Sequence, residues 1–337
     1  MLRVGTICYA TRQGIGWIPK RYYDAGVITD VVILHHHARH NHLDWYPEGT
    51  PVVAIRPFDK HECIHKLLEA VDVMLFIETP FDWDMLRLCR QYNVKSVIQC
   101  MYECTPQNPP YQPDLWMCPS LLDCEYFDGP FVPVPVPSEI KWKLRTTANR
   151  FLHNGGNLGL RGHKGTLEIL QAMEYVKSAI ELKVTSQDAA GLEKIKQKVP
   201  SCLTDTRIQF DTTDVPWETL YDNYDVFIMA EKYNGLSLPL QEAWASGLFV
   251  ITSDRYPMNT WLPRRGLIPV SRYQKARVGG PFMEYDEAVI DPKNIALTID
   301  RLYETSIEKE SKQGRAWAKL NSWDVLKPVI MEHLANA

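Results

Sequence analysis

Short apolar segments alternate with amphipathic segments over the first third of the chain. Runs rich in valine, isoleucine and leucine predict strands at residues 3–10, 31–34, 52–55, 73–77 and 97–98. Helical patterns lie between them at residues 61–70 and 82–92, and a further helix after the first strand ends at Gly26. Because strands alternate with helices of about ten residues, the pattern predicts a parallel sheet with right-handed crossovers.

Proline is dense between residues 106 and 137, where the sequence includes PQNPPYQP and FVPVPVPSE. Such a segment cannot form a central strand or a helix, because proline lacks the backbone N–H that both require. Its end therefore marks a connection between domains, near residues 138–149. We expect an N-terminal domain at residues 1–140, a second domain at 141–320 and a closing helix at 321–337.

The alternation restarts after this connection. Strands are predicted at residues 150–153, 180–184, 207–210, 224–230 and 249–252, and helices at 165–177, 217–223, 294–303 and 310–334. One βαβ unit is complete, with a strand at 224–230, a polar turn, a helix around 240–245 that stops at Gly247, and the strand at 249–252. Ligands in such units bind at the carboxyl ends of the strands, where the helix N-terminus offers free N–H groups to an anion.

The composition of the 337 residues is that of a globular protein, with 45% apolar residues, 23% charged residues and a net charge of −4. This charge gives no overall attraction to nucleic acid, although basic residues gather at 141–145 and 272–277. We see no secretory leader and no apolar run near the roughly 20 residues of a membrane span, so we expect a cytoplasmic protein. The eight cysteines lack CxxC spacing and are expected to be thiols, and the histidines between residues 35 and 42 match no common metal site.

The stretch NGLSLPLQEAWASG, from Asn234 to Gly247, closely resembles the donor-nucleotide signature of retaining GT-B glycosyltransferases, especially glycosyltransferase family four. In that family two glutamates flank seven residues; here Glu242 fills the second glutamate position and Asn234 the first. Other segments that resemble the family are Gly155-Gly156 before His163-Lys164-Gly165, residues 217–221 before 225–226, and Asn321-Ser322-Trp323-Asp324. The resemblance covers most of residues 150–330. It implies an α/β protein with the GT-B fold, in which two Rossmann-like domains face a cleft and a C-terminal helix crosses back to the first domain.

The resemblance also implies how a nucleotide-sugar donor is held. Lys164 would pair with the diphosphate, with Arg161 as a second cation because the family's usual arginine is absent at His153 and Asn154. Glu242 would bind the ribose, since a carboxylate offers acceptors to both hydroxyls of a diol. The other donor-binding candidates are Gly14 and Gly16, Asn234, and the backbone of Gly235, Leu236, Ser237 and Leu238. Each candidate has an ordinary alternative as a surface or turn residue.

The candidate catalytic residues are Asn234, Lys164 and Glu103. Asn234 would contact the transferred sugar, where an amide binds hydroxyls but lacks the family's negative charge. Glu103 follows a first-domain strand, as do Glu78 and Tyr102, and is a candidate for acceptor contact. In the retaining scheme that the resemblance implies, the departing phosphate takes the acceptor proton, and we expect no cofactor and no obligatory metal ion.

The resemblance therefore implies transfer of a sugar from a UDP- or GDP-linked donor to a hydroxyl acceptor. The residues leave the acceptor open among a glycan, a small molecule and a DNA base, and leave the oligomeric state open. One alternative is a phage-type enzyme that glycosylates hydroxymethylated DNA bases in the host cytoplasm. Another is a catalytically weak GT-B module that binds a glycan or nucleic acid, an alternative suggested by Asn234.

Overall fold

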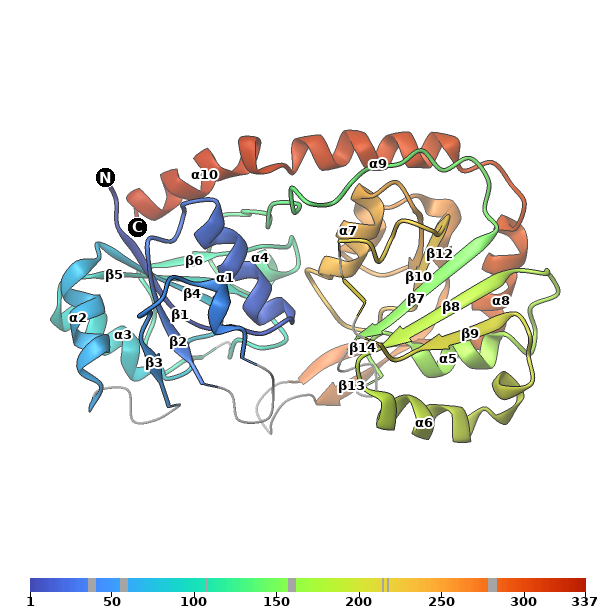
Figure 1. Ribbon diagram of the computed structural model, residues 1–337, viewed down its shortest axis with the longest axis horizontal. Coiled ribbons are helices and arrows are strands. Elements are labelled where there is room, and N and C mark those ends of the chain that lie inside the picture. The colour runs from blue at the N-terminus through green and yellow to red at the C-terminus, as the bar shows by residue number, and fades with distance from the viewer. Residues whose placement is uncertain are drawn as a thin grey trace. The chain divides into compact units, whose positions relative to one another are not determined.

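The computed structural model describes the chain except for residues 36–40, 55–59, 107, 157–161, 214, 217 and 278–283. The chain divides into two compact units, one formed by Met1–Pro135 with Asn321–Ala337 and the other by Val136–Leu320 (Figure 1). The first unit thus contains both ends of the chain, whereas the second is continuous. The connection after Pro135 lies near the domain boundary expected after residue 140.

A parallel sheet of six strands forms the centre of the first unit. Its strands are β1 (Val4–Tyr9), β2 (Asp30–Leu34), β3 (Val52–Val53), β4 (Val73–Glu78), β5 (Lys95–Cys100) and β6 (Leu115–Met117), in the spatial order β3-β2-β1-β4-β5-β6. The helices of this unit are α1 (Gly14–Asp24), α2 (Glu62–Ala70), α3 (Asp84–Gln91), α4 (Asp123–Tyr126) and α10 (Trp323–Ala335), with a 3-10 turn η1 (Leu43–Trp45). This strand order is that of a doubly wound, Rossmann-like sheet.

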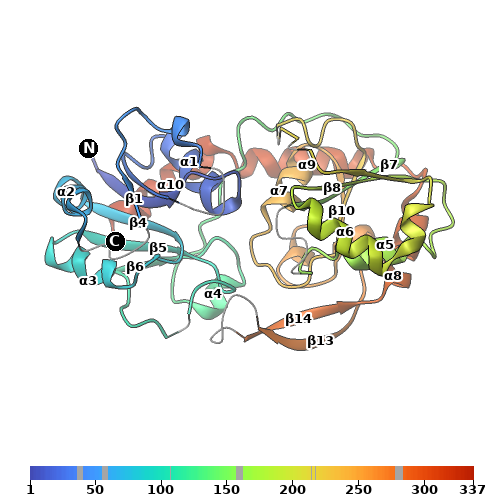
Figure 2. The same ribbon diagram turned by 60° about the horizontal axis from the view of Figure 1, so that its bottom comes forward.

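The second unit repeats the same order. Its strands are β7 (Arg150–Gly156), β8 (Glu181–Ser186), β9 (Ile208–Asp211), β10 (Val226–Met229), β11 (Phe249–Ser253) and β12 (Leu267–Ile268), arranged as β12-β11-β10-β7-β8-β9. The helices are α5 (Thr166–Ala172), α6 (Ala189–Lys198), α7 (Leu238–Ala245), α8 (Pro292–Leu302) and α9 (Glu308–Leu320), with 3-10 turns η4 (Pro200–Leu203), η5 (Met258–Thr260) and η6 (Arg264–Gly266). A separate antiparallel hairpin joins β13 (Val270–Arg277) to β14 (Glu284–Ile290) and stands apart from the sheet (Figure 2).

Apolar residues cover both faces of the second sheet. In β10, Val226 and Ile228 belong to one buried cluster, and Phe227 and Met229 belong to another. Successive side chains of a strand point to opposite faces, so a strand buried on both sides must be apolar throughout. This explains the continuous apolar runs from which the strands were predicted, and the predicted α/β class with parallel sheets is confirmed.

Some elements differ from the sequence-based expectations. Residues 218–223 form turns, so the helix expected at 217–223 is wrong over those residues, and Trp217 lies outside the described part of the chain. The proline-rich region contains the three-residue strand β6, which lies at the edge of the sheet, and the four-residue helix α4. The expectation that this region forms no helix is therefore wrong over Asp123–Tyr126, which like β6 contains no proline. The apolar pattern also does not predict α6 or the β13–β14 hairpin, because polar residues interrupt the apolar runs in both.

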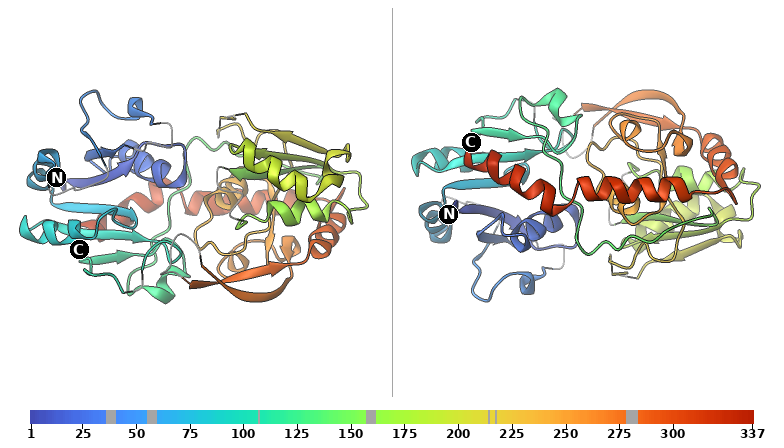
Figure 3. Two further views of the ribbon diagram at one scale, coloured as in Figure 1. Left: turned by 90° about the horizontal axis from the view of Figure 1, so that it is seen from below. Right: turned by 90° about the horizontal axis from the view of Figure 1, so that it is seen from above.

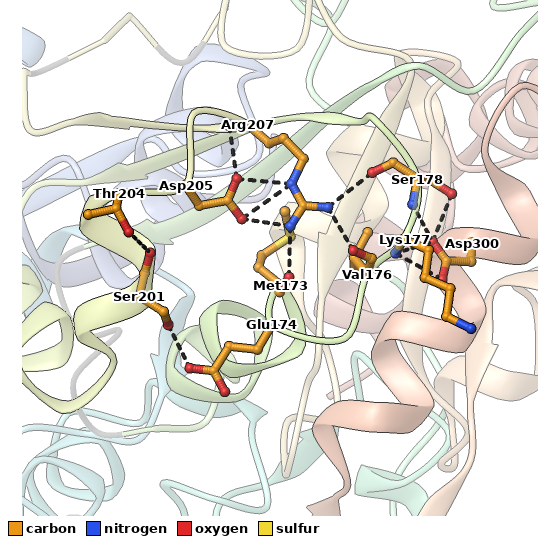
Figure 4. Close-up of polar contacts among 10 residues, drawn as sticks. All are labelled: Met173, Glu174, Val176, Lys177, Ser178, Ser201, Thr204, Asp205, Arg207 and Asp300. Carbon is orange, nitrogen blue, oxygen red and sulfur yellow. Dashed lines mark hydrogen bonds and ion pairs between the residues drawn. The ribbon is translucent and has the colours of Figure 1, made fainter.

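Arg207 fixes the segment that follows α5 (Figure 4). Its guanidinium group donates hydrogen bonds to the carbonyl groups of Met173 at 2.8 Å, Val176 at 2.7 Å and Ser178 at 3.1 Å. Asp205 accepts three further bonds from the same group, at 2.7, 2.9 and 3.2 Å. Because these carbonyl groups lie beyond the helix end, where intrahelical partners are lacking, Arg207 satisfies acceptors that the helix leaves open.

The helix α10 completes the first unit from the C-terminal end of the chain (Figure 3). Trp323 packs edge-on against the buried ring of Tyr22, with ring centroids 5.4 Å apart. Lys327 Nζ donates a hydrogen bond of 2.6 Å to the Ala25 carbonyl. The apolar side chains buried along the helix are Leu326, Ile330 and Leu334. Among the described residues, no helix is long and apolar enough to cross a membrane.

Candidate functional site

The second unit has a topological switch point between its two central strands, β7 and β10. The chain continues from β7 to β8 and β9 on one side, and from β10 to β11 and β12 on the other. Open α/β sheets bind ligands outside the carboxyl ends of the strands at such a point. The loops after β7 and β10 meet there, and the Lys232 N–H donates a hydrogen bond of 2.8 Å to the His163 carbonyl across them.

Lys164 is positioned by two glycines. Gly165 has φ +68°, and a Cβ at this residue would lie 2.6 Å from the Ala230 carbonyl oxygen at the end of β10. Gly156 has φ +59°, and a Cβ there would lie 2.6 Å from Lys164 Nζ. A larger residue at either position would separate the two loops or displace the ammonium group, and would also require a left-handed backbone that favours glycine.

His153 connects β7, β10 and α5 beneath this loop. The ring is fully buried, with Nδ1 2.9 Å from the Ile228 carbonyl and Nε2 2.8 Å from Thr166 Oγ1. A carbonyl oxygen only accepts, so Nδ1 carries the proton and Nε2 accepts from the threonine hydroxyl. Burial lowers the pKa of His153 to about 4, so the ring is neutral at pH 7. It serves as a structural link that fixes the start of α5 next to Lys164.

Lys164 is half-buried and lies within electrostatic reach of two carboxylates. Burial lowers the pKa of its ammonium group, and the charges of Glu231 and Glu242 act in the opposite direction. Within the part of the chain that the structure describes, no hydrogen bond or ion pair holds this ammonium group. A cation retained by charge alone is available to an incoming anion.

Asn234 binds its own loop. Its Oδ1 accepts the backbone N–H of Leu236 at 2.9 Å and that of Ser237 at 2.8 Å, just before α7. Those two N–H groups are therefore occupied in this structure, and Pro239 in the first turn has no N–H to offer. Of the backbone groups expected to face a donor, the N–H groups of Gly235 and Leu238 have no backbone partner among the described residues.

Glu242 projects from α7 and is oriented by a tyrosine. The Tyr221 hydroxyl donates a hydrogen bond of 3.0 Å to Glu242 Oε2, and Tyr221 itself is buried. Tyr221 belongs to the family-like stretch at residues 217–221, but its sequence position predicts no role for it. Its bond to Glu242 is a through-space contact across 21 residues of chain, which spacing alone does not show.

Glu231 and Arg255 are two charged residues of this site that the sequence analysis did not identify. Glu231 is only 1% exposed, and burial raises the pKa of its carboxyl group to about 7 against the opposing effects of Arg255 and Lys164. Arg255 is also buried and donates a hydrogen bond of 2.8 Å to the Asn234 carbonyl. The available signal was that Glu231 is the one acidic residue between Asp225 and Glu242.

The other predicted residues belong to the first unit or lie outside the described residues. Gly14, Gly16 and Glu103 belong to the first unit, and Arg161 lies outside the described residues. The glycine pair forms the first turn of α1, and a Cβ at Gly16 would lie 2.1 Å from the Thr11 carbonyl oxygen. Gly16 thus allows a close backbone contact. Glu103 is half-buried in the turn that follows β5.

No group of three or more histidine, cysteine, aspartate or glutamate side chains suited to a metal ion occurs among the described residues. His36, His37 and His40 of the histidine-rich segment lie outside that part of the chain. The eight cysteines are free thiols in the structure, as expected from the apolar segments in which several of them lie.

No family model matches the chain, and no curated protein matches it in sequence. Solved structures are similar to it over its whole length. HepE of Anabaena, solved with UDP and glucose, has 10% identity and a TM-score of 0.70, with 100% of both chains covered. Sucrose-phosphate synthase of Thermosynechococcus elongatus has 14% identity and a TM-score of 0.67, with 100% of this chain and 98% of that chain covered.

A third similar structure is the pneumococcal O-GlcNAc transferase GtfA, solved with UDP and GlcNAc. It has 11% identity and a TM-score of 0.64, with 99% of this chain and 98% of that chain covered. At these identities the likeness shows the fold. The fold class expected from the sequence is therefore confirmed as that of GT-B glycosyltransferases.

Proposed function

We propose that this protein is a glycosyltransferase whose donor is a nucleoside-diphosphate sugar linked to UDP or GDP. The observation that carries the proposal is Lys164, a half-buried cation at the switch point on which the charges of Glu231 and Glu242 act, and which forms no ion pair with any residue that the structure describes. A diphosphate supplies the counter-charge that such a site accepts. HepE and GtfA, which share the fold, were solved with UDP, which supports the same class of donor here.

In the proposed reaction Lys164 stabilises charge on the leaving group. The bond between the anomeric carbon and the phosphate oxygen breaks, and the negative charge that develops on the diphosphate is met by the ammonium group. We propose a retaining transfer. The acceptor oxygen bonds to the anomeric carbon on the face that the diphosphate leaves, and the acceptor proton passes to a departing phosphate oxygen. This scheme requires neither a protein base nor a metal ion.

Glu242 is proposed to hold the ribose. Tyr221 orients the carboxylate by its hydrogen bond to Oε2, and a carboxylate offers acceptors to both hydroxyls of a diol. Asn234 is proposed to contact the transferred sugar through its amide group while its oxygen caps the loop. Gly14, Gly16, Arg161 and Glu103 stay predictions from the sequence.

Calorimetric titration with UDP and with GDP tests the donor site. Lys164→Ala should weaken binding of the preferred nucleotide at least tenfold, because a charge-assisted contact contributes about 1.5–3 kcal/mol. Lys194→Ala, which removes an exposed lysine of α6, is the matched control and should bind like the wild type. We expect the same affinities in EDTA. Unchanged binding in both Lys164→Ala and Glu242→Ala would refute the proposal.

A second candidate is a GT-B module that binds a nucleotide sugar with little turnover. The observation that favours it is the engagement of Asn234 Oδ1 by two backbone N–H groups, which leaves no free acceptor oxygen where the family resemblance places a glutamate. Mass-spectrometric measurement of donor hydrolysis without acceptor separates the two. Release of sugar from a UDP- or GDP-linked donor supports the enzyme, whereas binding without release supports the module.

A further inference from the structure

The side chain of Glu231 is buried with incomplete hydrogen bonding. Its Oε2 accepts a hydrogen bond of 3.0 Å from Ser237 Oγ, but Oε1 is buried and has no hydrogen-bond partner among the described residues. The backbone of the same residue is fixed, because its carbonyl accepts a hydrogen bond from Ser253 Oγ. An ionised carboxylate with one oxygen unsatisfied is costly to bury, so a nearby change of charge can alter its protonation.

The charged groups around Glu231 come from three loops. Lys164 follows β7 and Arg255 follows β11, and both act on the carboxyl group as cations. The charge of Glu231 also acts on Tyr233, which lies on the same loop. The charge of Glu242, on α7, acts on Lys164. With His153 neutral, these described residues place two cations opposite two carboxylates, so their charges are close to balanced.

A bound diphosphate upsets this balance. It adds negative charge beside Lys164, and the ammonium group then compensates the diphosphate instead of Glu231 and Glu242. Glu242 retains the Tyr221 hydrogen bond and partial exposure, whereas Glu231 is buried with one oxygen unpaired. Glu231 is therefore the carboxylate that becomes protonated when the negative charge is added.

We propose that Glu231 is a positioning residue that balances Lys164 and Arg255 in the empty site and takes up a proton when the donor diphosphate binds. The inference rests on the proposed function, since it needs a diphosphate beside Lys164. The proton comes from solvent and remains on the carboxyl group while the donor is bound. The loop after β10 thereby loses its buried negative charge at the moment when the ligand supplies one.

The raised pKa of Glu231, about 7, sets the pH range of the effect. Below pH 7 the carboxyl group is already protonated in the free protein, and binding needs no proton. Above pH 7 it is ionised when free, and a proton must be taken up. The affinity for the donor should therefore fall as the pH rises, by about tenfold from pH 6 to pH 8 for one coupled group.

The test is calorimetry with UDP-glucose and GDP-mannose, whose diphosphate diesters do not titrate near neutral pH. At pH 7.5, titrations in HEPES and in Tris, which differ in ionisation heat, give the number of protons taken up on binding. Wild type should take up roughly 0.8 proton per site, the ionised fraction of a group with a pKa of about 7. Glu231→Gln, which preserves size and an acceptor for Ser237, should abolish both the uptake and the pH dependence. Glu231→Asp keeps an ionisable group and should retain the uptake.

The outcomes separate the inference from the proposed function. Binding to wild type without proton uptake would overturn the role of Glu231 and leave the donor assignment in place. Uptake that persists in Glu231→Gln would assign the proton to another group, with Lys164 the first to consider, and would also overturn it. If neither nucleotide sugar binds wild type, the proposed function fails and this inference fails with it. Glu193→Gln, on the exposed side of α6, is the matched control and should behave as wild type.

Discussion

Asn234 shows how a single side chain can serve the loop that carries it. Its Oδ1 accepts two backbone N–H groups, and Asn234→Ala would leave the N–H groups of Leu236 and Ser237 without this partner. We expect the free energy of unfolding to fall by about 2 kcal/mol, since two hydrogen bonds are lost together. Asn234→Asp retains the acceptor and should lose less than half as much. Urea unfolding followed by circular dichroism measures both.

The same pair of variants separates structure from sugar binding. If Asn234 contacts the transferred sugar, Asn234→Ala should spare nucleotide affinity and lower turnover, because the contact is realised mainly in the transition state. Equal losses of stability in Asn234→Ala and Asn234→Asp would show that the hydrogen bonds to the side-chain oxygen do not stabilise the loop. Equal turnover of wild type and Asn234→Ala would restrict this residue to the structural role.

At the residue scale, the candidates Lys164, Asn234 and Glu242 come from the resemblance to a family motif, and their roles stay predictions. The structure places Lys164 in the loop after β7, Asn234 in the loop after β10, and Glu242 on α7, where its charge acts on Lys164. Glu231 and Tyr221 were missed because their importance depends on burial and on contacts across the chain. A polar residue next to a strand end has no signature of its own until the packing around it is known.

The short helix α5 depends on a side chain far from it in sequence. Arg207→Lys keeps the positive charge but cannot reproduce the planar guanidinium that reaches three carbonyl groups and Asp205 at once. We expect a loss of about 2–3 kcal/mol in the free energy of unfolding. Arg301→Lys, on the exposed side of α8, is the matched control and should change it by less than about 0.5 kcal/mol. Similar stabilities for the two variants would show that the network adds little.

At the element scale, burial on both faces decides what the sequence reveals. Strand β10 is apolar throughout and β4 is apolar up to its last residue, Glu78, and both were predicted close to their observed bounds. The edge strand β6 has only three residues, β13 is largely exposed, and β14 alternates between buried and more exposed residues, so none of them carries a long apolar run. The helix expected at residues 217–223 is absent over the described residues 218–223 for a different reason. Arg145 donates hydrogen bonds to the carbonyls of Tyr221, Asp222 and Tyr224, which satisfies those groups without a helix.

At the scale of the whole molecule, the two units share one strand order but differ in how the chain builds them. The second unit is one continuous segment, and the first depends on α10 from the opposite end of the chain. The resemblance of residues 321–324 to a family motif predicted that the C-terminal helix joins the first unit. The apolar pattern could not show which unit α10 joins, because amphipathic spacing identifies a buried face and not its partner.

Ile330 tests whether the first unit relies on this return. The side chain is fully buried on α10, and Ile330→Ala should destabilise the first unit by about 3 kcal/mol through lost burial and the cavity left behind. Val325→Ala, at a position 46% exposed on the same helix, is the matched control and should change little. Hydrogen exchange read strand by strand measures the effect. Because local stability follows cooperative units, amides of β1 and β4 should exchange faster in Ile330→Ala while those of β7 and β10 keep their rates. Equal acceleration in both sheets would instead show that the two units unfold as one, and that α10 supports the whole chain.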